Sequence, residues 1–137
     1  MFGCNQDVTI WNRLPDETFR RAVIPVKVRW KQKFKRETSG FVEATGTITT
    51  VIIPYTNNFK PYDKWSKMSE SKRRRHKYFT IRPGDYIALG IHNDEITGEA
   101  PNRENDLFER LKPDCVQIKA VLDAIGPMAR HFKVEGV

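Results

Sequence analysis

The sequence of 137 residues has little of what several large protein classes require. It contains only two cysteines, Cys4 and Cys115, which have neither a CxxC partner nor a histidine at the spacing of metal ligands. We therefore expect two reduced thiols. No apolar stretch approaches the ~18 residues of a membrane span. The first residues lack both a basic region and an apolar core, so we expect no secretory signal.

Sequence motifs for catalysis are absent as well. The chain has no GxSxG, GxxxxGK[ST], HExxH or GxGxxG pattern. The three histidines, His76, His92 and His131, belong to separate segments of the chain. The sequence therefore predicts a protein that is not an enzyme and that uses no cofactor and no metal.

Charge is what the chain has in excess. There are 24 Lys and Arg residues against 17 Asp and Glu residues, a net charge of +7. The bases gather in residues 13–36, and acids outnumber bases in residues 94–114. A surface that is basic at one end and acidic at the other favours head-to-tail assembly over simple binding of nucleic acid.

The apolar pattern is mostly that of β-strands. Residues 7–12 and 47–53 are rich in strand formers, and alternation of apolar and polar residues predicts strands over about 18–31, 116–122 and 129–135. Pro25 marks an edge, a bulge or a break within the strand predicted over 18–31. A Pro83-Gly84 turn between residues 78–81 and 86–91 predicts a hairpin. We expect these side chains in the core: Val28, Trp30, Ile52, Ile87, Leu89, Ile118 and Phe132.

Two polar segments separate the strands. Residues 31–46 predict a loop or a hairpin tip that is longer than a tight turn requires. Residues 55–77 predict an insertion, with a helix over 64–76 and Asp63 as its N-cap. A second short helix is predicted over 104–112. The whole chain, residues 1–137, is thus predicted to form a single mainly β domain, a small barrel or sandwich of six or seven strands with one or two short helices.

Each polar segment carries a run of cations. The first basic stretch, residues 31–36, contains Lys31, Lys33, Lys35 and Arg36. The second basic stretch, residues 72–77, contains Lys72, Arg73, Arg74, Arg75 and Lys77. Either one suits contacts to phosphates, and either one also suits a solvated surface. The second stretch has the form of a nuclear-localisation signal, and its cations suit a helix C-terminus.

Several segments, taken in order, resemble a known protein family. They are the opening DVTIWNR, the strand ending VKVRW, then TVIIP, YFTIRPGDYIALG and the final RHFKVEG. As an ordered set they resemble the small "minor capsid" proteins of the head–tail module in tailed phages of Firmicutes. Those proteins are in turn similar to the head-closure, or stopper, proteins of long-tailed phages.

The resemblance implies a β-barrel subunit of the virion neck, assembled in the bacterial host cytoplasm. A homo-oligomeric ring would join the portal–adaptor to the tail and retain packaged double-stranded DNA through non-specific contacts, with no membrane involved. The loop after the second strand would enter the channel, which assigns Lys31, Lys33, Lys35 and Arg36 to the DNA. The insertion at 55–77, with its basic stretch, is the competing channel element. The acidic surface of Glu104, Asp106 and Glu109 would contact a neighbouring subunit.

Two other functions stay open. One is a different neck ring, such as a tail-completion or tail-terminator protein. The other is a monomeric nucleic-acid-binding barrel, which would place aromatic side chains beside basic ones on an exposed face.

Overall fold

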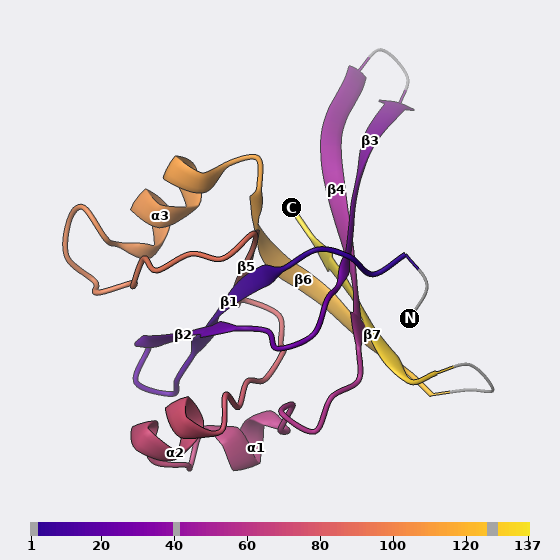
Figure 1. Cartoon of the computed structure of the whole chain (residues 1–137). Helices are drawn as coiled ribbons and strands as arrows, with labels where there is room; N and C mark the ends of the chain where they lie inside the picture. Colours follow the sequence, from indigo (N-terminus) through magenta and orange to yellow (C-terminus); the bar gives the residue numbers. More distant parts are fainter. Residues whose placement is uncertain (1–2, 40–41, 126–128) are drawn as a thin grey trace.

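The computed structural model describes the backbone of residues 3–39, 42–125 and 129–137, and the side chains of these residues except 34–39 and 42–47. This part of the chain forms seven strands and three short helices (Figure 1). The strands are β1 (Val8–Arg13), β2 (Phe19–Val23), β3 (Arg29–Ser39), β4 (Val42–Pro54), β5 (Tyr86–Leu89), β6 (Cys115–Ala124) and β7 (His131–Gly136). The helices are α1 (Tyr62–Trp65), α2 (Glu70–Arg75) and α3 (Glu104–Leu111).

The seven strands make one antiparallel sheet in the order β2-β1-β5-β6-β7-β4-β3. The mainly β class is thus confirmed. The sheet is open, because β2 and β3 are its edges and do not pair with each other. An isolated bridge between Gln6 and Val28 connects the segments that precede β1 and β3.

The main core lies between the two halves of this sheet. It combines Val8 and Ile10 of β1 with Val51 of β4 and Val134 of β7, all of them fully buried. Val51 and Val134 are direct cross-strand partners. A second cluster, on the other face of β1 and β5, contains Trp11 and is covered by Leu107 of α3. Strand β1 is therefore buried on both faces, which explains its almost continuous apolar sequence.

The core predictions are confirmed for Val28, Ile87, Ile118 and Phe132. Trp30 and Leu89 are half-buried and pack against the same cluster. Ile52 is half-buried as well, but it does not belong to this cluster. Its neighbours Val51 and Ile53 are fully buried, so Ile52 lies on the opposite face of β4.

A bulge interrupts the alternation on which the strand over 116–122 was predicted. The register shifts between Ile118 and Ala120, so one extra residue enters this strand. Beyond the shift the two faces exchange: Val121 packs inward, and Leu122 is 59% exposed. Simple alternation along residues 116–122 does not show such an insertion.

Of the two forms predicted for residues 31–46, the loop is wrong and the hairpin is right. Residues 31–39 and 42–46 belong to β3 and β4, which pair from Arg29 with Ile52 to Ser39 with Val42. The predicted long strand over 18–31 is divided between β2 and β3, with the break at Pro25, one of the places that this proline allows. Residues 31–39 and 42–46 are therefore the two paired strands of a β-hairpin, the β3–β4 arm.

The insertion at 55–77 also differs from its prediction. It contains two short helices, α1 and α2, in place of one helix over 64–76. Helix α2 is capped by Ser69, whose Oγ accepts a hydrogen bond from the Lys72 amide at 3.3 Å. Asp63 lies inside the first turn of α1. The short helix over 104–112 is confirmed as α3.

The predicted hairpin around Pro83-Gly84 is half right. The turn is present: Gly84 has φ +97°, and the Asp85 amide donates to the Arg82 carbonyl at 3.2 Å. Residues 78–81, however, form no strand beside β5. The partners of β5 are β1 and β6.

Candidate functional site

The first basic stretch lies along β3. Lys31 and Lys33 are exposed and, being two residues apart, lie on the same face of the strand. Lys35 and Arg36 continue the strand, and their side chains lie outside the described residues. The Gln32 side chain, on the opposite face, donates to the Pro113 carbonyl at 2.8 Å. Strand β3 thus presents at least two exposed cations, Lys31 and Lys33, on one face.

The hairpin carrying this stretch extends away from the rest of the sheet (Figure 1). Strand β7 pairs with β4 only from Thr49 to Pro54. The outer part of β4, residues 42–48, has β3 as its only neighbouring strand in the described part of the chain. The outer part of the arm is therefore a two-stranded extension of the sheet.

The second basic stretch divides into buried and exposed members. Arg73 is only 9% exposed. Its Nη1 donates to the carbonyls of Trp65 at 3.0 Å and Met68 at 2.7 Å, and its guanidinium lies 4.9 Å from the Trp65 ring centroid. Burial lowers the pKa of Arg73. The other members, Lys72, Arg74, Arg75 and Lys77, are exposed.

Arg73 therefore has a structural role, because its contacts connect α2 to α1. Its three contacts satisfy carbonyl groups at the end of α1 and in the following loop. Lysine lacks the planar guanidinium that lies over the Trp65 ring. Only the exposed members of the stretch remain candidates for binding a partner.

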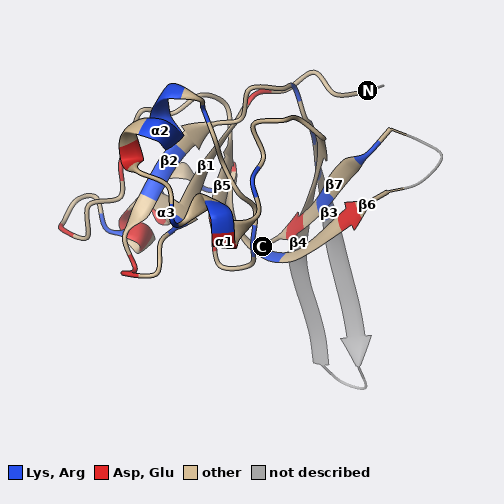
Figure 2. Cartoon of the chain, turned by 90° about the horizontal axis from the view of Figure 1, so that it is seen from below, with Lys and Arg blue, Asp and Glu red and all other residues tan. Residues whose placement is uncertain are grey.

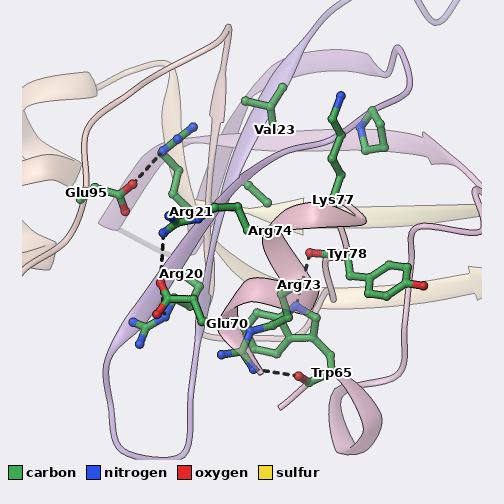
Figure 3. Close-up of a pocket in the computed structure, with 12 residues that line it drawn as sticks. Arg20, Arg21, Val23, Trp65, Glu70, Arg73, Arg74, Lys77, Tyr78 and Glu95 are labelled. Carbon is green, nitrogen blue, oxygen red and sulfur yellow. Dashed lines mark hydrogen bonds and ion pairs between the residues drawn. The ribbon is translucent and has the colours of Figure 1, made fainter. Parts of the chain in front are cut away.

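A groove of about 500 Å³ separates the edge strand β2 from α2 (Figure 3). Its cations are Arg20, Arg21, Arg73, Arg74 and Lys77, and its carboxylates are Glu70 and Glu95. Figure 2 shows the Lys and Arg residues of β2 and α2 at the same end of the molecule. Five cations against two carboxylates leave the groove positively charged.

The two carboxylates are bound by arginines. The Glu70 Oε1 atom accepts from Arg74 Nη2 at 3.1 Å and lies 3.4 Å from Arg20 Nε. The Glu95 Oε1 atom accepts from Arg21 Nε at 3.1 Å. The Nε group of Arg73 is buried and has no hydrogen-bond acceptor among the described residues. Both carboxylates of the groove thus already have arginine partners, and Lys77 has none among them.

A second cleft, of about 430 Å³, combines aromatic and basic side chains. It is lined by Tyr55, Phe59 and Tyr78 and by the cations Lys60, Lys64, Lys72 and Arg130. Arg130 lies 4.3 Å from the Tyr55 ring centroid and donates to Asp123 at 3.0 and 2.6 Å, which raises the pKa of Arg130. This arrangement of rings and cations is the kind expected of a nucleic-acid-binding module.

The predicted acidic surface has partners within its own chain. Glu104 accepts from Arg13 Nη2 at 3.0 Å and from the Tyr86 hydroxyl at 3.3 Å. Asp106 accepts from the Arg103 amide at 3.2 Å, and Glu109 pairs with Lys112 at 2.9 Å. The early basic and late acidic segments therefore meet within one molecule, through the Arg13–Glu104 and Arg21–Glu95 pairs.

A buried carboxylate, Asp85, is a feature that sequence reasoning missed. It is 1% exposed and accepts hydrogen bonds from Asn12 Nδ2 at 2.8 Å, the Arg13 amide at 3.0 Å and the Arg82 amide at 3.3 Å. Burial raises the pKa of Asp85 to about 6. Asn12 also donates to the Thr80 carbonyl at 2.6 Å. These hydrogen bonds hold the turn at 82–85 against β1. In the sequence, only the Pro-Gly-Asp motif points to this network.

Other reactive groups are enclosed or dispersed. Cys4 and Cys115 are free, and burial raises the pKa of the Cys115 thiol to about 12. Within residues 3–39, 42–125 and 129–137, no three His, Cys, Asp or Glu side chains cluster as metal ligands would. The helices of this same portion of the chain are all too short or too polar to cross a membrane.

Residues 3–137 match DUF6751, a family of unknown function, and the chain belongs to this family. No curated protein matches the chain.

Proposed function

We propose that this protein is a structural subunit of a tailed-phage neck, a head-closure ring that joins the portal–adaptor to the tail and retains packaged DNA. The observation that carries the proposal is the β3–β4 arm, which follows the second strand of the sheet and extends beyond the core. Stopper proteins obstruct the channel with the segment at this position, as the resemblance implies.

The arm suits a channel element in its charge and in its stiffness. Lys31 and Lys33 lie on one face of β3, at the end of the arm nearest the sheet. A ring brings many copies of the arm together, so that weak phosphate contacts of each copy sum. Contacts to the DNA backbone, made without reading bases, still allow DNA to leave at infection. A paired hairpin resists the pressure of DNA better than an unpaired loop would.

The proposal also includes closure of the open sheet into a barrel. A barrel requires the edges of the open sheet to approach each other, and the Gln6–Val28 bridge already joins the segments before β1 and β3. We propose that barrel closure is completed in the ring. The ring would form in the bacterial host cytoplasm and reside in the virion neck. Tail-completion or tail-terminator rings are the nearest alternatives, and the position of the subunit in the virion separates them.

A second candidate function has one specific observation in its favour. The cleft lined by Tyr55, Phe59 and Tyr78 places rings beside cations, which suits a nucleic-acid-binding module. Such a module would act as a monomer and bind single strands. It gives no role to the β3–β4 arm, and this is why the neck function is preferred.

Deletion of the gene from a prophage that carries it, followed by complementation, tests the neck function. The first variant changes Lys31, Lys33, Lys35 and Arg36 to glutamine. The matched control changes Lys72, Arg74, Arg75 and Lys77 to glutamine, which removes the same charge and spares the buried Arg73. We expect filled heads that lose their DNA before tails attach in the first variant only.

Two outcomes would contradict this expectation. Leakage in the control alone would move the channel role to the second basic stretch. Normal infectious particles after deletion of the whole gene would exclude the neck function.

A further inference from the structure

We propose that the outer edge of β2 binds an extended acidic segment of a partner protein, which adds as a strand in the groove between β2 and α2. This inference goes beyond the neck function and does not require a ring. It follows from the free backbone groups of β2 and the charge of the groove.

The hydrogen-bond pattern shows which backbone groups of β2 face the groove. The Ile24 amide donates to Val8, and the Leu14 amide donates to Thr18, at the two ends of the β1–β2 ladder. In an antiparallel pair, residues that bond to the partner alternate with residues that face away. Residues 18, 20, 22 and 24 therefore bond to β1, and Phe19, Arg21 and Val23 direct their N–H and C=O groups outward.

Two of these three outward residues are open to a partner. The Phe19 carbonyl accepts from Arg20 Nη1 at 3.0 Å. The backbone groups of Arg21 and Val23 have no backbone partner among the described residues, and both residues line the groove. Pro25 also lines the groove and ends the usable edge. A partner strand would thus form a short ladder of backbone hydrogen bonds with Arg21 and Val23, as in recognition by strand addition.

The charges select an acidic partner. The side chains of a bound strand would alternate between the face that contains Arg20 and the face that contains Arg21. On the first side, Arg74 of α2 adds a further cation. Carboxylates of a partner supply the opposite charge and accept charge-assisted hydrogen bonds from exposed arginine N–H groups.

Apolar side chains set the remaining preference. Val23, Trp65 and Tyr78 line the same groove. Small apolar residues between the acids would therefore pack against the groove without burying a charge. The occupant that fits is an extended segment in which Glu or Asp alternates with Val or a residue of similar size.

The probe is a capped, fluorescent peptide in which Glu or Asp alternates with Val, titrated with the whole purified chain. Val23→Pro removes an outward N–H and leaves the ladder to β1 intact, and proline is tolerated at this kind of edge position. Val23→Ala is its control, because it keeps the N–H. We expect about tenfold weaker binding by Val23→Pro than by Val23→Ala, the effect of losing roughly one hydrogen bond.

A second pair of variants tests the charge. Arg74→Gln with Lys77→Gln removes two cations from the groove, whereas Lys31→Gln with Lys33→Gln removes two from the arm. We expect about tenfold weaker peptide binding for the first pair and no change for the second. Circular dichroism spectra that match the natural chain confirm that every variant is folded.

The proposal fails under any of three results. These are equal binding by Val23→Pro and Val23→Ala, equal binding of a peptide methylated at its backbone amides, and equal effects of the two charge pairs. It also fails if a short DNA duplex binds in the groove and the acidic peptide does not, since the groove would then be a general polyanion site.

Discussion

The two basic stretches of this chain resemble each other in sequence and differ in structure. In residues 31–36 the cations with described side chains, Lys31 and Lys33, lie exposed along one strand. In residues 72–77 five of the six residues are cations, four of them on a short helix, and one member, Arg73, is buried against Trp65. The comparison teaches that a run of cations is not one functional unit, because burial assigns its members to different tasks.

The difference arises from local geometry. On an extended strand, alternate side chains share a face, so Lys31 and Lys33 both project from the sheet. On a helix, consecutive residues point in different directions, so one of four successive cations turns toward the core. Its guanidinium remains charged there because carbonyl oxygens and an aromatic face replace water.

The largest effect is expected from Arg73→Ala. The change leaves the Trp65 and Met68 carbonyls without their donor and opens a gap beside the indole ring. We expect the free energy of unfolding to fall by about 2–4 kcal/mol, measured by urea denaturation. Arg74→Ala, a residue with 81% of its side chain exposed, is the control and should change stability by less than about 0.5 kcal/mol. Equal losses in the two variants would remove the distinction between buried and exposed members.

A buried charge of the opposite sign extends the comparison. Asp85→Asn keeps the shape of the side chain but turns an N–H₂ group toward a backbone or side-chain donor. We expect a loss of about 1–3 kcal/mol at pH 7, measured by the same denaturation experiment.

The same substitution should remove a pH dependence. The pKa of Asp85 is raised from 3.8 to about 6 in the folded chain, so the folded state holds this proton more tightly than the unfolded state. The stability of the natural chain, compared with that of Asp85→Asn, should therefore increase as the pH falls from about 6 to 4. A difference between the two proteins that does not change over this range would show that Asp85 is not buried as described.

How far the sequence predicted these features depends on the kind of signal. Strands with one apolar face, such as β7, were predicted with the correct inward residue, Phe132. Period-two alternation failed where the backbone departs from it, at the β6 bulge that exposes Leu122. It also failed in the run Val51-Ile52-Ile53, where every residue is apolar and the pattern has no phase.

The candidate site was predicted less well, because its properties are long-range. The β3–β4 arm looked like a loop since its residues are polar on both faces, and pairing between distant residues decides its form. The burial of Arg73 and the outward backbone of β2 depend on contacts that local composition does not contain. The Arg13–Glu104 pair joins residues that charge counts had placed on opposite ends of the molecule.

A smaller effect is expected from reversing the acids of α3. Glu104, Asp106 and Glu109 have partners within the chain, and all three are changed to lysine in one variant. Loss of exposed ion pairs and of the bond to the Arg103 amide should cost about 1–2 kcal/mol in total. If these acids also contact a neighbouring subunit, the folded variant should not be incorporated into virions. Normal incorporation, seen by mass spectrometry of purified particles, would exclude that contact.

The smallest effect on stability is expected on the β3–β4 arm itself. Lys31→Gln with Lys33→Gln should change the free energy of unfolding by less than about 0.5 kcal/mol, because both side chains are exposed. Their effect should appear instead in DNA binding. Each lost phosphate contact lowers the slope of log affinity against log salt concentration by about 0.9 for duplex DNA, so the double variant should lose up to about 2 in slope.

Arg74→Gln with Arg75→Gln is the matched pair from the second stretch. Fluorescence anisotropy at several salt concentrations compares DNA binding by the two double variants. If the slope falls only in the arm variant, the first stretch is the one that contacts DNA; if it falls equally in both, the exposed cations of the two stretches contact DNA alike and the preference for the arm is wrong.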